Sequence, residues 1–285
     1  MPSRLRQLTG VSTGATTTIA LPSGSTHYLV DGPGGGPTVV FVPGATLPLF
    51  VWDGLAETAA AAGFRTVRYD LLGRGDSSAP NVRYDEDLHR RQLTELLNAV
   101  APDAPVHLVS LAFGCLIAAD VARRRPDRVA SLTCIAPDGF GVPLPRGTSL
   151  LRMPVIGDAL VRLVGARILL RRLGDYSADP HVVAALRQRF EPYAHSAGLH
   201  RAVLSSIRHM PIHDAVDAYA RVAVPTRVLW GSDDRVTPLP APERVAAAFP
   251  GATVTILDGV GHLPQYERPD EVAAAVLGFV GGIRA

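Results

Sequence analysis

The sequence predicts an α/β protein with a mostly parallel central sheet, helices on both faces and a helical insertion. Two observations lead to this prediction. Short β-branched runs alternate with helical patterns through the first half of the chain and again near its end, which is typical of a parallel sheet covered on both sides. Between positions 138 and 222 no strand pattern occurs. We therefore expect residues 1–137 and 223–285 to form one core domain, and residues 138–222 to form a helical cap.

Composition indicates a folded enzyme of ordinary size. Of the 285 residues 47% are hydrophobic and 19% charged, a balance that excludes disorder. All 28 basic residues are arginine, the formal charge is +2, and the arginine clusters are too short for a nucleic-acid footprint. No run of 18 apolar residues occurs, so no membrane span is predicted, and residues 1–10 lack the apolar h-region of a signal peptide. With only two cysteines, the sequence predicts a cytoplasmic protein without a nucleic-acid partner.

Five strands and three helices are predicted in the first half of the chain. The run Thr38–Val42 is continuously apolar, as expected of a buried central strand. Gly63 closes the first helix as its C-cap, and Pro126 ends the third. The predicted strands are Thr26–Asp31, Thr38–Val42, Arg65–Asp70, Val106–Leu111 and Val129–Ile135. The predicted helices are Trp52–Ala62, Asp85–Val100 and Phe113–Arg125.

After the helical insertion, the alternation of strands and helices resumes. The insertion itself fits three helices, at Pro154–Leu173, Pro180–Tyr193 and Leu199–His209. The last part of the chain fits Thr226–Trp230 and Thr253–Leu257 as strands, and Glu243–Ala248 and Pro269–Val280 as helices.

The first helix of the insertion has amphipathic spacing. Its apolar positions are Ile156, Leu160, Leu163 and Val164, and its arginines are Arg162, Arg167 and Arg171. We expect the apolar residues to pack against the core or to line a lipophilic cavity. A membrane-surface role is the least favoured interpretation, because the helix lacks aromatic anchors.

Several reactive or glycine-rich segments follow predicted strands. Ligands of open α/β sheets bind beyond the carboxyl ends of the strands, so these segments are expected to share one site. They are Val42-Pro43-Gly44-Ala45-Thr46, Gly73-Arg74-Gly75-Asp76-Ser77, Ser110-Leu111-Ala112-Phe113-Gly114, Gly231-Ser232-Asp233-Asp234 and Gly259-Val260-Gly261-His262.

In this order, the segments resemble those of the α/β-hydrolase superfamily over nearly the whole chain. That family presents a nucleophile on a G-x-S-x-G elbow, followed along the chain by an acid and a histidine. The resemblance implies that His262 is the base and Asp234 its orienting acid. It also implies that the N–H groups of Ala45 and Phe113 form the oxyanion hole. The nucleophile position is Ala112.

Two other acids remain candidates for the role of Asp234. Asp233 is its neighbour, and Asp138 follows the strand Val129–Ile135, from whose end some relatives supply the acid. The chain also departs from the family at Pro43-Gly44, where His-Gly is frequent. The oxyanion hole can survive that change, because its donor belongs to a later residue.

The methyl group of Ala112 cannot attack a carbonyl, so acyl-enzyme chemistry through this position is excluded for the chain as written. Ser110 belongs to the strand and Cys115 is expected to be a buried thiol, so neither replaces the missing nucleophile. In one interpretation the alanine replaces a natural serine of an esterase-like hydrolase with a Ser-His-Asp triad. In the other, alanine is natural. The protein is then a lyase, cyclase or isomerase that uses the His262–Asp234 dyad as general base, or a ligand-binding pseudohydrolase.

The expected ligand is a small, lipophilic acyl compound. We find no pattern of metal ligands and no phosphate-binding or dinucleotide-binding loop, so no metal and no cofactor are predicted. The sequence does not indicate an oligomeric state.

Overall fold

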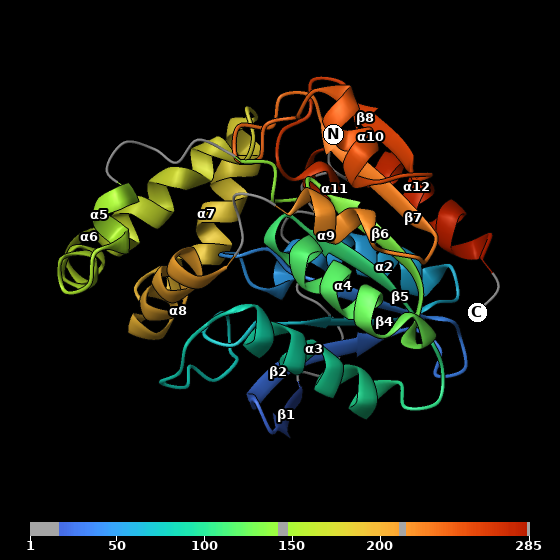
Figure 1. The fold of residues 1–285 in the computed structure, drawn as a ribbon, viewed down its shortest axis with the longest axis horizontal. Helices are drawn as coiled ribbons and strands as arrows, with labels where there is room; N and C mark the ends of the chain where they lie inside the picture. The colour runs from blue at the N-terminus through green and yellow to red at the C-terminus, as the bar shows by residue number, and fades with distance from the viewer. Residues whose placement is uncertain (1–16, 142–147, 211–214, 284–285) are drawn as a thin grey trace.

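The computed structural model describes residues 17–141, 148–210 and 215–283. Its centre is an eight-stranded sheet in the order β1-β2-β4-β3-β5-β6-β7-β8 (Figure 1). The pairs β1–β2 and β2–β4 are antiparallel, and every later pair is parallel. The strands are β1 (Thr17–Leu21), β2 (Gly24–Asp31), β3 (Thr38–Val42), β4 (Arg65–Tyr69), β5 (Val106–Leu111), β6 (Val129–Ile135), β7 (Thr226–Gly231) and β8 (Thr253–Leu257).

Two layers of helices cover the sheet. One layer is built around α4, which contacts β3, β5 and β6 as well as α3 and α9, and α10 packs on α9. The other layer holds α2, α11 and α12, which contact one another. The helices of the two layers are α2 (Asp53–Ala61), α3 (Glu86–Val100), α4 (Phe113–Arg124), α9 (Val216–Ala220), α10 (Pro242–Ala248), α11 (Pro264–Glu267) and α12 (Pro269–Gly281). The central strands β3, β4, β5 and β6 are thus buried on both faces, as the alternating pattern predicts.

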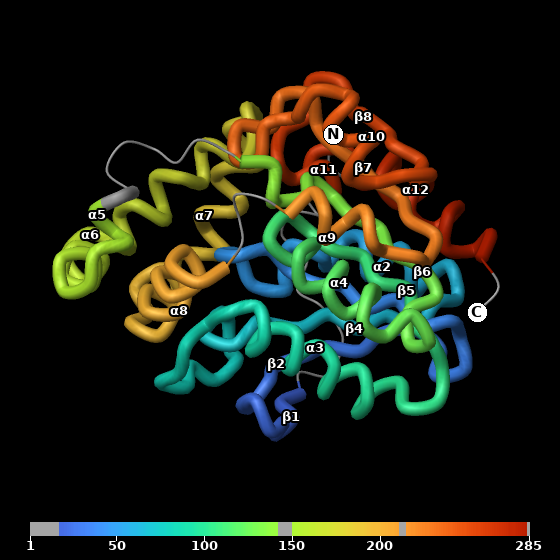
Figure 2. The backbone as a smooth tube through the Cα atoms, in the orientation of Figure 1, coloured from blue at the N-terminus to red at the C-terminus, as the bar shows by residue number. Residues whose placement is uncertain are grey.

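Between β6 and β7 the described chain is helical. The helices are α5 (Thr148–Arg152), α6 (Ile156–Arg172), α7 (Pro180–Ala194) and α8 (Ala197–His209), with the short 3₁₀ turn η3 (Leu173–Asp175). They lie to one side of the layered core, at the left of Figures 1 and 2. We call α5–α8 the insertion. Because α9 packs on α4, the division of the chain at residues 138 and 222 stays a prediction.

The elements predicted from the sequence are present, and most of their ends agree to within two residues. Four short elements were missed: β1, α5, α9 and α11. Strand β1 pairs with β2 only and is mostly exposed, so it lacks the apolar signal of a buried strand. In the described residues, no helix is both long and apolar enough to cross a membrane.

Candidate active site

A sharp turn at Ala112 joins β5 directly to α4. Its backbone angles are φ 46° and ψ −113°, which residues other than glycine rarely adopt. Such a conformation costs roughly 1–3 kcal/mol and persists only when the surroundings hold it. Here the Ala112 N–H donates to the Ile135 carbonyl at 2.9 Å, and the Ala112 carbonyl accepts from the Cys115 N–H at 2.9 Å. The strained elbow is therefore formed without a serine in it.

Gly114 lets the start of α4 approach the turn after β3. A Cβ at this position would lie 2.5 Å from the Pro43 carbonyl oxygen and 2.7 Å from that of Val42. This close approach brings the N-terminus of α4 beside the Pro43-Gly44-Ala45 turn. Within the described chain, neither Ala45 nor Phe113 donates its N–H to a protein acceptor. Both predicted oxyanion donors thus stay available beside the elbow.

The predicted base and acid are in contact. Asp234 follows β7 and His262 follows β8, and His262 Nδ1 lies 2.9 Å from Asp234 Oδ2. Both residues are buried: His262 is 2% exposed and Asp234 is 5% exposed. With its Nδ1–H donated to the carboxylate, a neutral imidazole keeps Nε2 as an acceptor. This is the tautomer that a general base requires.

Asp234 is held as a carboxylate by several donors. Its Oδ1 accepts the N–H groups of Val236 and Thr237, and its Oδ2 accepts the Thr237 hydroxyl at 2.8 Å. Burial raises the pKa of Asp234, but the charge and hydrogen bond of His262, together with the Thr237 donors, leave the pKa below its ordinary value. A charged Asp234 can therefore orient His262.

Neither of the two alternative acids makes the short contact with His262 Nδ1. Asp233 is exposed and accepts from Ser232. Asp138 follows β6 and donates its backbone N–H to the Ala112 carbonyl at 3.3 Å. Burial raises the pKa of Asp138 to about 6; the charge of His262 opposes this rise and that of Asp234 adds to it. Asp138 is thus a third ionisable group near the dyad, while the short contact with His262 Nδ1 belongs to Asp234.

The two substitute nucleophiles weighed from the sequence are buried. Ser110 donates its hydroxyl to the Thr133 carbonyl at 2.9 Å. Cys115 is fully buried, and burial raises the pKa of its thiol. Neither group is placed to attack a ligand at the elbow.

Two residues near the site were not assigned from the sequence. Arg74 is buried and donates from Nε to the Ala45 carbonyl at 2.9 Å and from Nη2 to the Ser206 hydroxyl of α8 at 3.0 Å. Arg74 therefore fixes the peptide plane that follows Ala45. Arg74 belongs to the glycine-rich segment Gly73–Ser77 that is expected at the site, but the burial of its side chain is visible only in the folded chain.

Tyr176 follows η3 in the insertion and covers His262. Its carbonyl accepts the His262 N–H at 2.8 Å, and the centroids of the two rings are 5.2 Å apart. No local sequence pattern links Tyr176 to a histidine 86 positions later, so only the folded chain reveals this contact.

One group of described residues has the spacing of metal ligands: His27, Asp70 and Asp76. The Asp70 carboxylate already has protein partners for both of its oxygens. His27 Nδ1 lies 2.6 Å from Asp70 Oδ2, and Asp70 also accepts the N–H groups of Leu49 and Asp76. We therefore treat the group as an internal ion pair and assign no metal to it.

Comparison with known proteins places these features in context. A family model described as "Alpha/beta hydrolase family" matches residues 39–275. The chain is 28% identical to a 2-hydroxy-6-oxononadienedioate/2-hydroxy-6-oxononatrienedioate hydrolase of Paraburkholderia xenovorans, over 98% of this chain and 99% of the relative. It is 25% identical to Lipase 3 of a Moraxella species, over 78% of this chain and 71% of the lipase. An uncharacterized protein of Mycobacterium tuberculosis is 27% identical, over 83% of this chain and 73% of that protein.

Solved structures with the same fold include two enzymes. A thermophilic esterase from Thermogutta terrifontis superimposes with a TM-score of 0.79 and 22% identity, over 95% of this chain and all of the esterase. An enol-lactonase from Burkholderia xenovorans gives a TM-score of 0.77 and 21% identity, over 93% of this chain and all of the lactonase. At these identities the likeness concerns the fold alone.

Proposed function

This chain belongs to the α/β-hydrolase family, and on that basis we propose that its site serves to cleave an ester or related acyl bond once a serine occupies position 112. Named relatives of the chain are hydrolases. The observation that carries the proposal is the contact of His262 with Asp234, combined with the strained elbow at Ala112.

The proposed reaction has two steps. His262 Nε2 takes the proton of the serine hydroxyl while the serine oxygen bonds to the acyl carbon. The oxyanion that forms accepts from the N–H groups of Ala45 and Phe113, each worth about 3 kcal/mol in the transition state. When the bond to the alcohol breaks, the imidazolium returns the proton to the leaving oxygen. A water molecule activated by His262 then releases the acid and restores the serine.

As the chain stands, the first step has no nucleophile. The alanine protein should bind its substrate and leave it uncut, which is the behaviour of a Ser→Ala knockout. We propose a small, lipophilic acyl compound as the substrate, because lipases are among the relatives.

The test is the variant A112S, assayed with p-nitrophenyl esters from acetate to long acyl chains. We expect hydrolysis at least a thousandfold above that of the alanine protein for some acyl length, because nucleophile and base act together. The control is the double variant A112S/H262A, which should return to the background rate. No gain in A112S at any chain length would contradict the proposal.

A second candidate function is favoured by Asp138. A carboxyl group with a pKa of about 6, next to an intact His–Asp dyad, offers both an acid and a base without any nucleophile at position 112. The natural alanine protein would then catalyse an elimination, cyclisation or isomerisation, with His262 removing a proton and the oxyanion hole stabilising an enolate.

Turnover by the alanine protein distinguishes this second candidate function from the first. The alanine protein should convert a substrate, and H262A should abolish that turnover. If ligand affinity is unchanged in H262A and no product forms with the alanine protein or with A112S, the protein is a binding-only pseudohydrolase.

A further inference from the structure

The outer surface of α5 and α6 exposes more aliphatic side chain than an internal packing role explains. Leu163 is 81% exposed and Val155 78%. Three further residues, Leu150, Met153 and Ile156, are between 46% and 48% exposed. The amphipathic spacing predicts that Ile156 and Leu163 pack inward or line a cavity, and that prediction is wrong for both. The reason is that α5, α7 and α8 take the other sides of α6.

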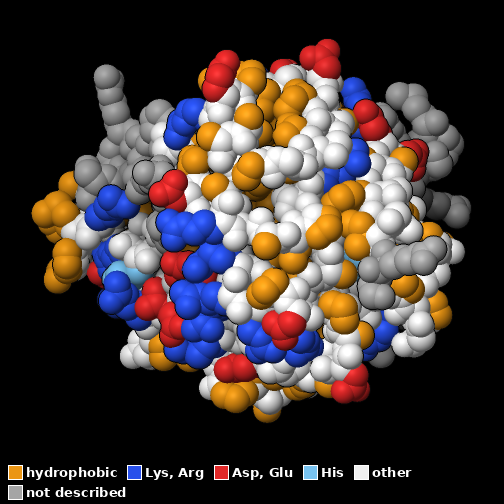
Figure 3. Space-filling model, turned by 45° about the vertical axis from the view of Figure 1, so that its right-hand side comes forward, with side chains coloured by type: hydrophobic (Ala, Val, Ile, Leu, Met, Phe, Trp, Pro, Cys, Tyr) orange, Lys and Arg blue, Asp and Glu red, His pale blue; other side chains and the backbone are white. Residues whose placement is uncertain are grey.

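Basic side chains accompany these apolar residues. Arg162, Arg167 and Arg171 are exposed on α6, and within the described chain no ion pair joins any of them to an acid. Figure 3 shows hydrophobic and basic side chains next to one another at the left edge of the molecule, where the insertion lies. We call these eight residues of α5, α6 and their connection the outer face of the insertion.

The charge of the chain is concentrated in the insertion. Residues 148–209 hold nine arginines and four acids, whereas the whole chain has 28 basic and 26 acidic residues. The rest of the protein is therefore slightly acidic. The insertion thus combines a net positive charge with exposed apolar side chains. A binding surface that complements it would be both apolar and anionic.

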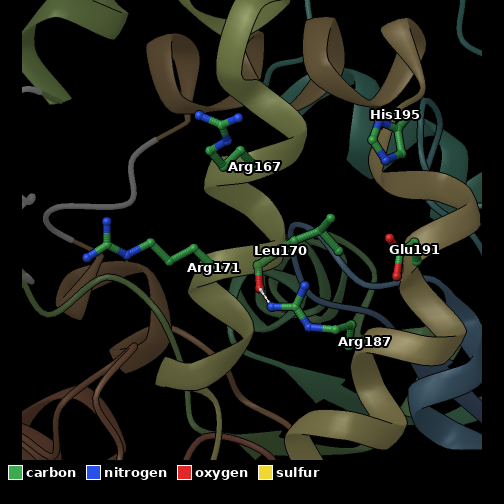
Figure 4. Close-up of a pocket in the computed structure, with 6 residues that line it drawn as sticks. All are labelled: Arg167, Leu170, Arg171, Arg187, Glu191 and His195. Carbon is green, nitrogen blue, oxygen red and sulfur yellow. Dashed lines mark hydrogen bonds between the residues drawn. The ribbon is translucent and has the colours of Figure 1, made fainter.

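A pocket between α6 and α7 shows whether the arginines form a site for one small anion or a basic surface. It has a volume of about 460 Å³ and is lined by arginines, Leu170, Glu191 and His195 (Figure 4). Arg187 donates to the Leu170 carbonyl across it, and the Glu191 carboxylate also lines it. In Figure 4, Arg171 extends away from Glu191 and His195. The arginines thus do not converge on a small bound anion, and they are spread over a surface instead.

From these observations we infer that the outer face of the insertion docks on a lipid bilayer that contains anionic phospholipids. The aliphatic side chains of Leu163, Val155 and Ile156 enter the boundary between headgroups and acyl chains, while Arg162, Arg167 and Arg171 bind headgroup phosphates. Arginine stems are apolar and can lie along that boundary with their charged ends in the headgroup layer.

A protein partner fits this surface less well. Protein interfaces are enriched in aromatic anchors, and the outer face has none. The missing aromatic residues made a membrane role the least favoured from the sequence. The exposure of five apolar residues in the structure reverses that order, because they supply apolar area without aromatic side chains.

The test is co-sedimentation of the purified full chain with large unilamellar vesicles, either of phosphatidylcholine alone or with 30% phosphatidylglycerol. We expect at least tenfold stronger partitioning to the anionic vesicles at low salt, and most of that gain lost at 0.5 M NaCl. The readout is binding, so it is independent of the proposed hydrolytic activity.

Two variants of the outer face dissect the two contributions. I156S/L163S should weaken binding to anionic vesicles at least tenfold, because each buried aliphatic side chain contributes strongly to partitioning. R162Q/R167Q/R171Q should weaken it by about fivefold for each charge removed, at about 1 kcal/mol per basic residue.

The control variants change exposed residues that lie outside the outer face. V254S/I256S replaces two aliphatic residues of β8 that are 39% and 44% exposed, and R125Q/R221Q removes two exposed arginines outside the outer face. Both controls should bind vesicles as the parent does. The circular dichroism spectra of all variants should match that of the parent, which checks that they are folded.

Three outcomes would overturn the inference. The first is equal binding to both vesicle types. The second is equal loss in the outer-face variants and the controls. The third is a parent that is dimeric in solution, becomes monomeric in I156S/L163S and does not bind vesicles, which would make the outer face a self-interface.

Discussion

At the scale of single residues, the site depends on backbone positions more than on reactive groups. Ala112 holds the strained elbow angles through hydrogen bonds of its own peptide groups. Gly114 lets the first turn of α4 approach the carbonyl groups of Val42 and Pro43. Arg74 fixes the Ala45 carbonyl. These contacts set the position of the oxyanion donors, whichever side chain stands at position 112.

Replacing Gly114 by alanine tests this dependence. The new Cβ would meet the Pro43 oxygen at 2.5 Å, so the turn or the helix must move. We expect G114A to lower the free energy of unfolding by about 1–3 kcal/mol, as overpacking does, and to impair hydrolysis in the A112S background.

A glycine in the same helical position provides the control. Gly54 is the second residue of α2, as Gly114 is of α4, and a Cβ there would meet nothing within 4 Å. G54A should leave stability unchanged or raise it by up to about 1 kcal/mol. Equal effects in urea unfolding of G54A and G114A would show that the close approach is unimportant.

At the scale of elements, α7 of the insertion is joined to the core by an ion pair. Arg189 Nη2 lies 2.6 Å from Asp53 Oδ2 at the start of α2, and its guanidinium lies 4.5 Å from the centroid of the Phe50 ring. Arg68 of β4 approaches the other Asp53 oxygen at 3.0 Å. Asp53 is 3% exposed, so both arginines compensate a buried charge.

The variant R189M should loosen the insertion from the core. Loss of a hydrogen-bonded buried pair should lower the free energy of unfolding by about 1.5–3 kcal/mol, with Arg68 still compensating Asp53. Limited proteolysis should cut residues 148–210 several times faster than in the parent.

Gln188, exposed on the same helix, serves as the control site. Q188A should match the parent in both measurements. If R189M is cut no faster than Q188A, the ion pair does not hold the insertion in place.

At the scale of the whole molecule, stability depends on a buried ion pair that joins β2 to the turn after β4. His27 is 6% exposed and Asp70 is 1% exposed. Burial lowers the pKa of His27, but the hydrogen bond and charge of Asp70 and the charge of Asp76 leave the pKa above its ordinary value. Burial raises the pKa of Asp70 above its ordinary value, and the charge and hydrogen bond of His27 and two N–H groups oppose that rise. We therefore assign a charged pair.

The pH dependence of unfolding follows from the raised pKa of His27. The folded protein holds the His27 proton more tightly than the unfolded chain does, so the stabilisation is present below pH 6.5 and is lost as the pH rises through the higher folded pKa. In urea unfolding between pH 6 and 9, the parent should exceed H27Q by roughly 1.5–3 kcal/mol at the acid end.

That difference should shrink steadily toward pH 9. A replacement of exposed His181 by glutamine, H181Q, supplies the comparison and should show no such trend. A difference between parent and H27Q that grows with pH would reverse the assigned sign and reject the charged pair.

How much the sequence determined differs between the fold and the site. The strand and helix patterns predicted the sheet and its helices, because burial imposes a period that can be counted along the chain. The helices α5, α9 and α11 were missed because four or five residues make little more than one helical turn. Strand β1 was missed because it is mostly exposed and has no apolar run. The positions of Ala112, Asp234 and His262 were predicted from motif order, since each follows the end of a strand and parallel strands end at one edge of the sheet.

By itself, the sequence determined which groups are present: an imidazole, a carboxylate and a methyl group where a nucleophile would stand. Only the tertiary structure decided which groups meet. It paired His262 with Asp234 and left Asp233 exposed, it set Tyr176 against His262, and it turned Leu163 outward. The physical reason is that contacts between residues far apart in the chain depend on how helices pack in three dimensions. A helical period shows that a face is apolar, but not which neighbour, if any, covers it.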